Sequence, residues 1–154
     1  MLKQAPTNVP AHIFRAYDIR GVVDIDLTEE IVHDIGVALG SEAQDLGEKT
    51  VIVGRDGRLS GPKLSAALKA GILSSGCNVI DIGIVPTPVM YFATKTLGVT
   101  SGIMLTGSHN PANYNGIKIV MQDITFTEAQ IQKMYQRLTK GDVDKVKACY
   151  VNNQ

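Results

Sequence analysis

Apolar positions along the chain alternate between short continuous runs and longer stretches with helical spacing. Residues that recur three or four positions apart predict four helices, which span 28–46, 60–76, 87–98 and 127–140. Short apolar runs predict strands or strand-like segments between them, at 13–23, 50–53, 79–84, 101–105 and 116–121. Because strands alternate with helices, we expect an α/β protein, a three-layer α/β/α sandwich with a mostly parallel sheet. A short polar loop joins the last two strands, which predicts one antiparallel edge strand.

The ends of the predicted helices carry capping residues. We expect Thr28 to cap the first helix and Ser60 to cap the second, with Pro62 in its first turn. Thr127 and Gln130 have the spacing of a capping box for the fourth helix. The helical spacing then predicts that the inner faces of the first three helices consist of Ile31, Ile35, Leu39, Leu64, Leu68, Ile72, Met90, Ala93 and Leu97.

Composition limits the classes of function. The chain has 154 residues, 44% of them hydrophobic and 19% charged, which predicts one globular domain with a substantial core. The formal net charge is zero, which argues against binding to nucleic acid through general basic charge. The sequence has neither an apolar run of membrane-spanning length nor the apolar core of a signal peptide near its start. Cys77 and Cys149 lack metal-binding spacing, so we expect a buried Cys77 thiol in a reducing, cytoplasmic compartment.

A polar turn interrupts the apolar pattern after the run 101–105. Ser108 lies in it between a glycine and His109, Asn110-Pro111 fixes the turn, and the next apolar run carries Lys118. A hydroxyl, an imidazole and an amine therefore lie in or beside one loop. Such a loop is either an ordinary surface turn or the centre of a reaction site, and a short motif alone does not decide. The Gly-x-Ser-x-Gly pattern of hydrolases is absent, because Asn110 occupies the position of its second glycine.

The wording of this loop is more specific than its composition. Thr-Gly-Ser-His-Asn-Pro at 106–111, followed by Asn-Gly-Ile-Lys at 115–118, resembles the phosphoserine loop of the α-D-phosphohexomutases. This family includes the phosphomannomutase/phosphoglucomutases. Phe-Arg-Ala-Tyr-Asp-Ile-Arg-Gly at 14–21 and Gly-Arg-Asp-Gly-Arg-Leu-Ser at 54–60 resemble the same family, in the same order. The resemblance spans nearly the whole chain but only the first of the family's four domains.

The resemblance implies a phosphoryl-transfer function. Phosphorylated Ser108 would exchange its phosphoryl group with hexose 1-phosphate and hexose 6-phosphate through hexose 1,6-bisphosphate. Lys118 would be the general acid or base, and His109, Arg20 and Tyr17 would contact the substrate or assist proton transfer. Mg²⁺ would bind the phosphate on Ser108. The family's first domain has a mixed four-stranded sheet, which we therefore expect here.

The resemblance also implies a domain organisation. Residues 1–12 would form an N-terminal arm, 13–141 the phosphohexomutase domain 1, and 142–154 a polar tail or the start of a linker to a second domain. The family's Asp-Gly-Asp-Gly-Asp metal loop, sugar-recognition loop and distal phosphate-binding loop belong to later domains and do not occur in this sequence. We therefore expect this segment to be inactive alone, with the remaining domains of a full-length mutase as its partners.

Two other interpretations stay open on the residues. Asp24-Ile-Asp26-Leu-Thr28 fits the Asp-x-Asp-x-Thr pattern of haloacid-dehalogenase-type phosphatases, in which Asp24 would be phosphorylated, although a turn before a capped helix has the same pattern. The chain could also be a non-catalytic domain that binds phosphosugars or docks to a partner. Arg55 and Asp56 follow a predicted buried strand, where they could either meet a ligand or close a loop as an ion pair.

Overall fold

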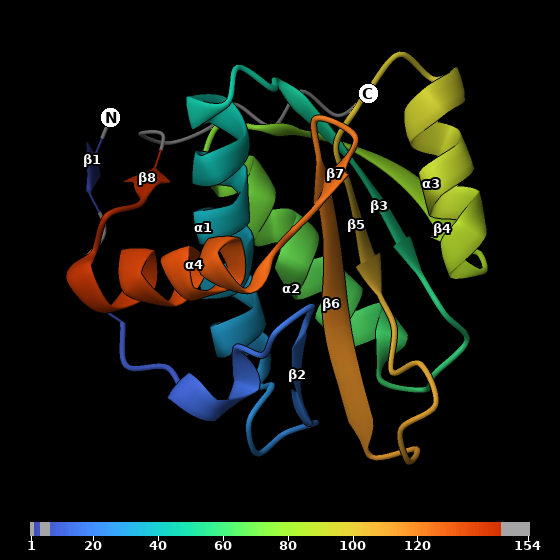
Figure 1. Cartoon of the computed structure of the whole chain (residues 1–154). Helices are drawn as coiled ribbons and strands as arrows, with labels where there is room; N and C mark the ends of the chain where they lie inside the picture. The colour runs from blue at the N-terminus through green and yellow to red at the C-terminus, as the bar shows by residue number, and fades with distance from the viewer. Residues whose placement is uncertain (1, 4–6, 146–154) are drawn as a thin grey trace.

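The chain folds into a central sheet with helices on both sides (Figure 1). The computed structural model describes residues 2–3 and 7–145. The helices are α1 (Glu29–Asp45), α2 (Gly61–Ser74), α3 (Thr87–Thr96) and α4 (Glu128–Lys140), with a short 3-10 helix η1 (Ala11–Ile13). The strands are β1 (Leu2–Lys3), β2 (Ile19–Val22), β3 (Thr50–Arg55), β4 (Asn78–Ile84), β5 (Gly102–Leu105), β6 (Tyr114–Met121), β7 (Ile124–Thr125) and β8 (Asp144–Lys145). The predicted three-layer α/β/α class is confirmed.

The main sheet has six strands rather than the expected four, in the order β2-β6-β5-β3-β4, with β7 also paired to β6. β3 is parallel to both β4 and β5, whereas β6 is antiparallel to β5, β2 and β7. Among the described strands of this sheet, β6 alone therefore runs against the others. It is also internal, which corrects the predicted antiparallel edge strand. β7 has two residues and β2 has four, too few to leave a clear periodic pattern.

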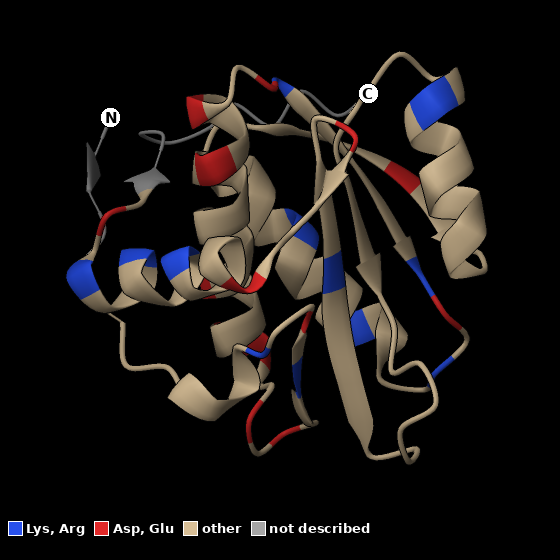
Figure 2. Ribbon diagram, viewed as in Figure 1, with Lys and Arg blue, Asp and Glu red and all other residues tan. Residues whose placement is uncertain are grey.

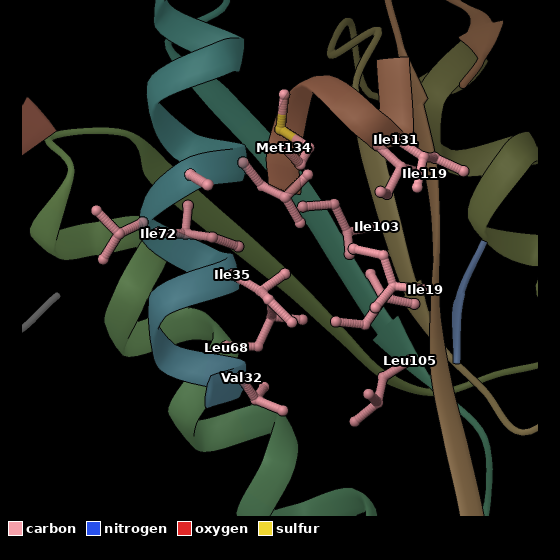
Figure 3. Close-up of a cluster of buried hydrophobic side chains, with 14 of the residues drawn as sticks. Ile19, Val32, Ile35, Leu68, Ile72, Ile103, Leu105, Ile119, Ile131 and Met134 are labelled. Carbon is pink, nitrogen blue, oxygen red and sulfur yellow. The ribbon is translucent and has the colours of Figure 1, made fainter. Parts of the chain in front are cut away.

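The two faces of the sheet have different covers. α1, α2 and α4 pack on one face, where the large core contains Ile117 and Ile119 of β6 (Figure 3). On the other face α3 packs against a smaller cluster that contains Met90, Met104 and Val120. Alternate residues of β6 thus point to opposite faces. Since only α3 covers the second face in the described part of the chain, the end of that face near β2 carries no helix (Figure 1).

α1 is more buried than its predicted stripe implies. Ile35 and Leu39 are fully buried as expected, but Ile31 is only half-buried, and nearly every residue from position 34 to 43 is buried. Close contact with α2 explains this, because a Cβ on Gly36 would lie 2.4 Å from the carbonyl oxygen of Leu68. Glycine therefore allows the two helix backbones to approach each other. The spacing of apolar residues cannot signal such a contact.

Two of the predicted helix starts are confirmed in detail. Thr28 accepts a hydrogen bond from the backbone N–H of Ile31 at 3.1 Å, so it caps α1. Thr127 and Gln130 form both bonds of the capping box, and Gly141 ends α4 in a left-handed conformation. These ends depend on neighbours in sequence, which is why local patterns predict them.

Two other predictions about the helices are wrong. Ser60 precedes α2 but adopts a helical conformation and makes no capping bond. Its hydroxyl instead accepts a hydrogen bond from Asn115 of β6 at 2.9 Å, so a tertiary contact replaces the cap. Leu97 is 52% exposed rather than buried, because α3 ends at Thr96. The other inner-face residues of α2 and α3 are buried as predicted.

The two ends of the described chain meet, since β1 and β8 form a separate antiparallel pair. Val143, in the predicted polar tail, is buried in the core. Positions 146–154, including Cys149, lie outside the described residues. Cys77 is buried, and burial raises the pKa of its thiol to about 11, with the nearby charge of Glu48 adding to the effect. Within the described ranges, no helix has the length and apolar character needed to cross a membrane.

Candidate active site

The loop between β5 and β6 holds Ser108 in an unusual conformation. The backbone N–H of Thr106 donates to the carbonyl of Gly116 at 2.8 Å, so the ladder of β5 and β6 continues up to the start of the loop. Ser108 then has a φ of 52°, in the left-handed region that non-glycine residues seldom adopt. Ser108 and His109 are both exposed. The fold thus presents the predicted hydroxyl at the end of a buried strand.

Bonds within the loop support this conformation. The N–H of Ser108 donates to the hydroxyl oxygen of Thr106 at 3.1 Å. Asn110 donates to the carbonyl of Gly107 through both its backbone N–H, at 3.0 Å, and its side-chain amide, at 2.9 Å. The Asn-Pro turn inferred from the sequence is therefore a closed turn. Its side chains bond to the loop's own backbone, which is typical of Asn and Thr in turns.

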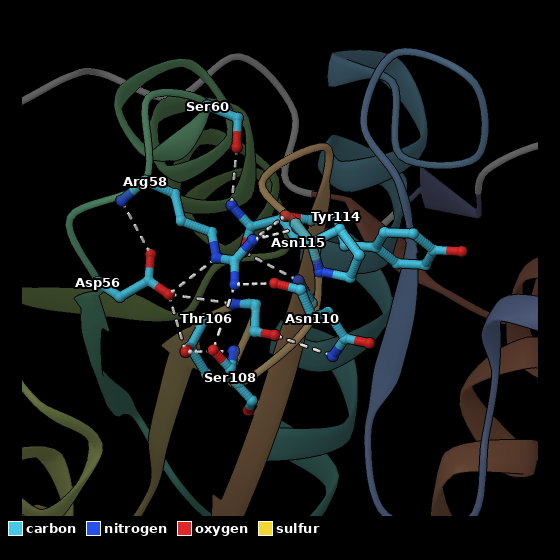
Figure 4. Close-up of polar contacts among 11 residues, drawn as sticks. Asp56, Arg58, Ser60, Thr106, Ser108, Asn110, Tyr114 and Asn115 are labelled. Carbon is cyan, nitrogen blue, oxygen red and sulfur yellow. Dashed lines mark hydrogen bonds and ion pairs between the residues drawn. The ribbon is translucent and has the colours of Figure 1, made fainter.

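Two residues after β3 bind the same loop from outside (Figure 4). One carboxylate oxygen of Asp56 accepts hydrogen bonds from the hydroxyl of Thr106 at 2.9 Å and from the N–H of Gly107 at 3.0 Å. The guanidinium of Arg58 lies 3.4 Å from the same oxygen. It donates to four backbone carbonyls of the loop, those of Ser108 (3.2 Å), Asn110 (2.7 Å), Pro111 (2.6 Å) and Tyr114 (3.0 Å).

Arg20 and Lys118 lie on the same face of the sheet. Arg20 pairs with Gly116, and Lys118 lies two residues further along β6 and pairs with Met104. Since Met104 belongs to the cluster under α3, both basic residues are on the α3 face. Each is half-buried, and Arg20 donates to Asp18 from Nε at 3.2 Å and from Nη2 at 2.8 Å. This part of the face carries no helix, which leaves space above both side chains.

The remaining predicted residue, Tyr17, is 77% exposed just before β2. In the described part of the chain, no hydrogen bond or ion pair joins any two of the predicted site residues, Tyr17, Arg20, Ser108, His109 and Lys118. The fold therefore places them around one end and one face of the sheet without direct contacts. Figure 2 shows basic and acidic positions interspersed over the described helices and strands.

An open hollow of about 510 Å³ lies on the other side of the serine loop, between it and the loop after β3. Its lining comes from Asp56, Gly57, Arg58, Leu59, Asn110 and Ala112. None of the predicted site residues lines it, so the hollow is distinct from the face that carries Arg20 and Lys118.

The described residues do not form a magnesium site by themselves. Among them there is no group of three or more His, Cys, Asp or Glu side chains able to hold a metal ion. The carboxylate nearest to the serine loop, Asp56, is already bonded to Thr106, Gly107 and Arg58. A phosphate on Ser108 could supply oxygen ligands, but the rest would have to come from outside this segment.

The Asp-x-Asp-x-Thr stretch forms a turn between β2 and α1. Asp24 has a left-handed φ of 66°, and its carboxylate, 66% exposed, pairs with Lys63 at 2.6 Å. Asp26 accepts a hydrogen bond from the N–H of Val22 at 3.0 Å and lies 3.1 Å from His12. Thr28 caps the following helix. Each residue of the pattern thus has a structural contact, which favours the turn over a phosphatase site.

Sequence reasoning missed Arg58 and the role of Asp56 as partners of the serine loop. The motif at 54–60 drew attention to the end of β3, where an Asp-Arg ion pair closing a loop was one interpretation. The structure shows that Asp56 pairs with Arg58 instead of Arg55, and that the loop they hold is some fifty residues away. The useful signal was the parallel order of strands, because β3 and β5 are neighbours and their carboxyl ends lie together.

The sequence and structure of the chain match one family. Residues 11–145 match the model of the phosphoglucomutase/phosphomannomutase alpha/beta/alpha domain I, so the chain belongs to this family. A phosphomannomutase/phosphoglucomutase from Pseudomonas aeruginosa is 55% identical over 140 residues, which cover 91% of this chain and 30% of that protein. A phosphoglucomutase from Neisseria meningitidis serogroup B is 42% identical over 133 residues, 86% of this chain and 29% of that protein.

Solved structures agree with this assignment. A phosphoglucomutase/phosphomannomutase family protein from Burkholderia thailandensis matches 90% of this chain and 32% of its own with a TM-score of 0.85 and 43% identity. A phosphomannomutase from Thermus thermophilus, so described in its title with reservation, matches 89% of this chain and 32% of its own at a TM-score of 0.75 and 29% identity. The chain thus spans about a third of the length of these relatives.

Proposed function

We propose that this chain is the phosphoserine-bearing domain of a phosphohexomutase that interconverts hexose 1-phosphate and hexose 6-phosphate. The observation that supports this most is the loop at Ser108. Its hydroxyl is exposed while its backbone N–H and carbonyl are bonded to Thr106 and Arg58. A phosphoryl carrier needs this combination of a free side chain and a fixed backbone, because phosphoryl transfer depends chiefly on positioning and charge stabilisation.

In the proposed cycle, phosphorylated Ser108 gives its phosphoryl group to the free hydroxyl of a hexose phosphate. The bond from phosphorus to the serine oxygen breaks, a bond to the sugar oxygen forms, and hexose 1,6-bisphosphate results. The bisphosphate reorients and returns its other phosphoryl group to Ser108. Lys118 takes up the proton of the attacking hydroxyl and returns a proton to the departing oxygen.

The other predicted residues contact the substrate in this proposal. Arg20 would provide a positive charge for a sugar phosphate, and its two bonds to Asp18 orient its guanidinium. His109 and Tyr17 are exposed on the same side of the molecule's polar turns and would contact the sugar or assist proton transfer. Mg²⁺ on the phosphoserine would neutralise phosphoryl charge, with further ligands from later domains. Without those domains we expect no mutase turnover from this segment.

The test is phosphorylation of the full-length chain that contains this segment. Incubated with glucose 1,6-bisphosphate and Mg²⁺, it should gain one phosphoryl group that maps to Ser108 by mass spectrometry. A serine phosphate is an ester with a poor leaving group, so the label should survive hydroxylamine. Ser108→Ala should remove the label and most of the turnover between glucose 1-phosphate and glucose 6-phosphate.

Asp24→Asn is the matched control, since it removes the other candidate phosphoryl acceptor. It should leave the label and the turnover close to those of the unmodified chain. An acyl phosphate on Asp24 would be cleaved by hydroxylamine. A hydroxylamine-sensitive label, or one lost in Asp24→Asn and kept in Ser108→Ala, would support the phosphatase instead. Sugar phosphate binding with no label and no turnover would support the non-catalytic binding domain.

A further inference from the structure

We propose that Arg58 is a positioning residue that holds Ser108 in its left-handed conformation and thereby sets the place of its hydroxyl. This inference rests on the proposed function of Ser108. The contact joins two loops that follow adjacent parallel strands, β3 and β5, about fifty residues apart in sequence. Arg58 makes no contact with the predicted catalytic side chains, so its effect would pass through the backbone of the loop.

The donor atoms of Arg58 support a positioning role rather than phosphate binding. An arginine has five N–H bonds. Nη1 and Nη2 each bond two loop carbonyls, and Nε faces the carboxylate of Asp56. All five directions are thus directed at the protein. No donor is left for a phosphate, although the guanidinium lies beside the phosphoryl acceptor.

The conformation of Ser108 explains why such a support is needed. A left-handed φ costs a non-glycine residue roughly 1–2 kcal/mol. The bond from Nη2 of Arg58 to the Ser108 carbonyl fixes the peptide that follows this strained residue. Without Arg58, water would solvate the exposed carbonyls and Ser108 could relax to a common backbone conformation. A displacement of the hydroxyl by about 1 Å would cost on the order of a hundredfold in rate.

Gly107 makes room for the guanidinium. A Cβ at this position would lie 2.1 Å from both Cζ and Nε of Arg58, which is far closer than atoms can approach. The φ of Gly107 is not in the left-handed region, so its backbone does not itself require glycine. The need for glycine arises from the flat packing of Arg58 on the loop. Gly107→Ala should therefore displace Arg58 and have the same effect as removing it.

The first experiment compares kinetic constants in the full-length chain. Arg58→Ala should lower kcat about a hundredfold with KM changed less than about threefold, because a positioning residue acts in the transition state. Arg58→Lys should not restore kcat, since one ammonium cannot reach the four carbonyls. Added guanidinium ion at millimolar concentration should partly rescue Arg58→Ala, whereas methylammonium should not. A raised KM with unchanged kcat would mean that Arg58 binds substrate and would overturn the proposal.

The second experiment is a double-mutant cycle with a matched glycine control. Gly107→Ala and Arg58→Ala should each lower kcat, and the double variant should be no worse than either, because both remove one contact. Gly57→Ala should leave kcat unchanged, since an added Cβ there meets no atom within 4 Å. Full additivity of the two kcat effects, or an equal loss in Gly57→Ala, would contradict the proposed contact.

Failure of the two proposals can be told apart. If the unmodified chain gains no label on Ser108, the proposed function fails. The role of Arg58 is then decided by hydrogen-exchange mass spectrometry of the peptide that contains 106–114. Faster exchange in Arg58→Ala than in Gly57→Ala would support positioning, and equal exchange would overturn it. If Ser108 is labelled and kcat is unaffected by Arg58→Ala, only the positioning role is wrong.

Discussion

Arg58 and Arg137 are both largely buried arginines that join segments distant in sequence, but they bond to different partners. The side chain of Arg58 is 16% exposed and bonds to four backbone carbonyls, with one carboxylate at 3.4 Å. The side chain of Arg137 is 6% exposed and bonds twice to the carboxylate of Glu42, at 3.0 and 2.8 Å, and once to Asp45. The first arginine orders a loop, and the second joins α4 to α1.

The difference in partners determines what each arginine contributes. Glu42 is 5% exposed, so its charge depends on Arg137 and on Lys133, which lies 2.9 Å away. Burial by itself lowers the pKa of Arg137, but hydrogen bonds to Asp45 and Glu42 raise it further, so the guanidinium stays charged. The carbonyls held by Arg58 are neutral and near the surface, where water can replace it. We therefore expect Arg137 to affect stability and Arg58 to affect local conformation.

The largest effect should come from Arg137→Met, which leaves the buried charge of Glu42 without its main partner. Breaking a buried ion pair from one side typically costs about 3–5 kcal/mol, and because Lys133 remains we expect about 3 kcal/mol. The measurement is the free energy of unfolding from a urea titration. Replacing Glu42 and Arg137 together by Met should restore part of the loss. A loss below about 1 kcal/mol in the single variant would remove the contrast with Arg58.

A smaller effect on unfolding is expected for Arg58→Ala. The hydrogen bonds that it loses contribute about 1 kcal/mol in total or less, since the freed carbonyls reach water. The same urea titration checks this value, with Arg15→Ala, an exposed arginine, as the control. If Arg58→Ala destabilised the chain as much as Arg137→Met, Arg58 would be a structural residue of the fold, and its kinetic effect would have to be reinterpreted.

The smallest effect is expected for Asp81→Asn, which removes an ion pair with Lys69 that is partly exposed on both sides. Burial acts to raise the pKa of Asp81, but the hydrogen bonds from Lys69 and Gly83 outweigh it and the pKa is lowered. A lowered folded-state pKa stabilises the fold above the ordinary aspartate pKa, and this contribution is lost as pH falls through the folded-state value.

The expected loss for Asp81→Asn is therefore about 0.5 kcal/mol at pH 7, the size typical of exposed pairs. It should disappear below about pH 3, where the carboxyl of the unmodified chain is protonated. Unfolding titrations of both proteins at pH 7 and pH 3 measure the difference. A loss that stayed constant between these pH values would show that charge is not its cause and that exposed and buried pairs cannot be compared in this way.

The candidate site was predictable from the sequence to a different degree for each residue. The wording of the stretch 106–118 identified the loop of Ser108 and, with the two other motifs, the family that the comparison confirmed. Roles for Tyr17, Arg20, His109 and Lys118 remain predictions. Arg58 stood in a quoted motif without a partner, because its contacts depend on which strand lies beside β3. Spacing along the chain carries no information about that neighbour.

The sequence by itself determined the class of fold and most of the helix ends. Capping bonds, the left-handed glycine after α4 and the buried stripe of α2 join residues at most a few positions apart, so local patterns are sufficient. Only the tertiary structure decided that β6 is internal, that β2 and β7 extend the sheet, and that Ser60 bonds to Asn115 instead of capping α2. It also decided that Asp56 and Arg58 meet the serine loop. Strand order is set by the packing of all helices on the two faces of the sheet at once, and each of these contacts follows from that order.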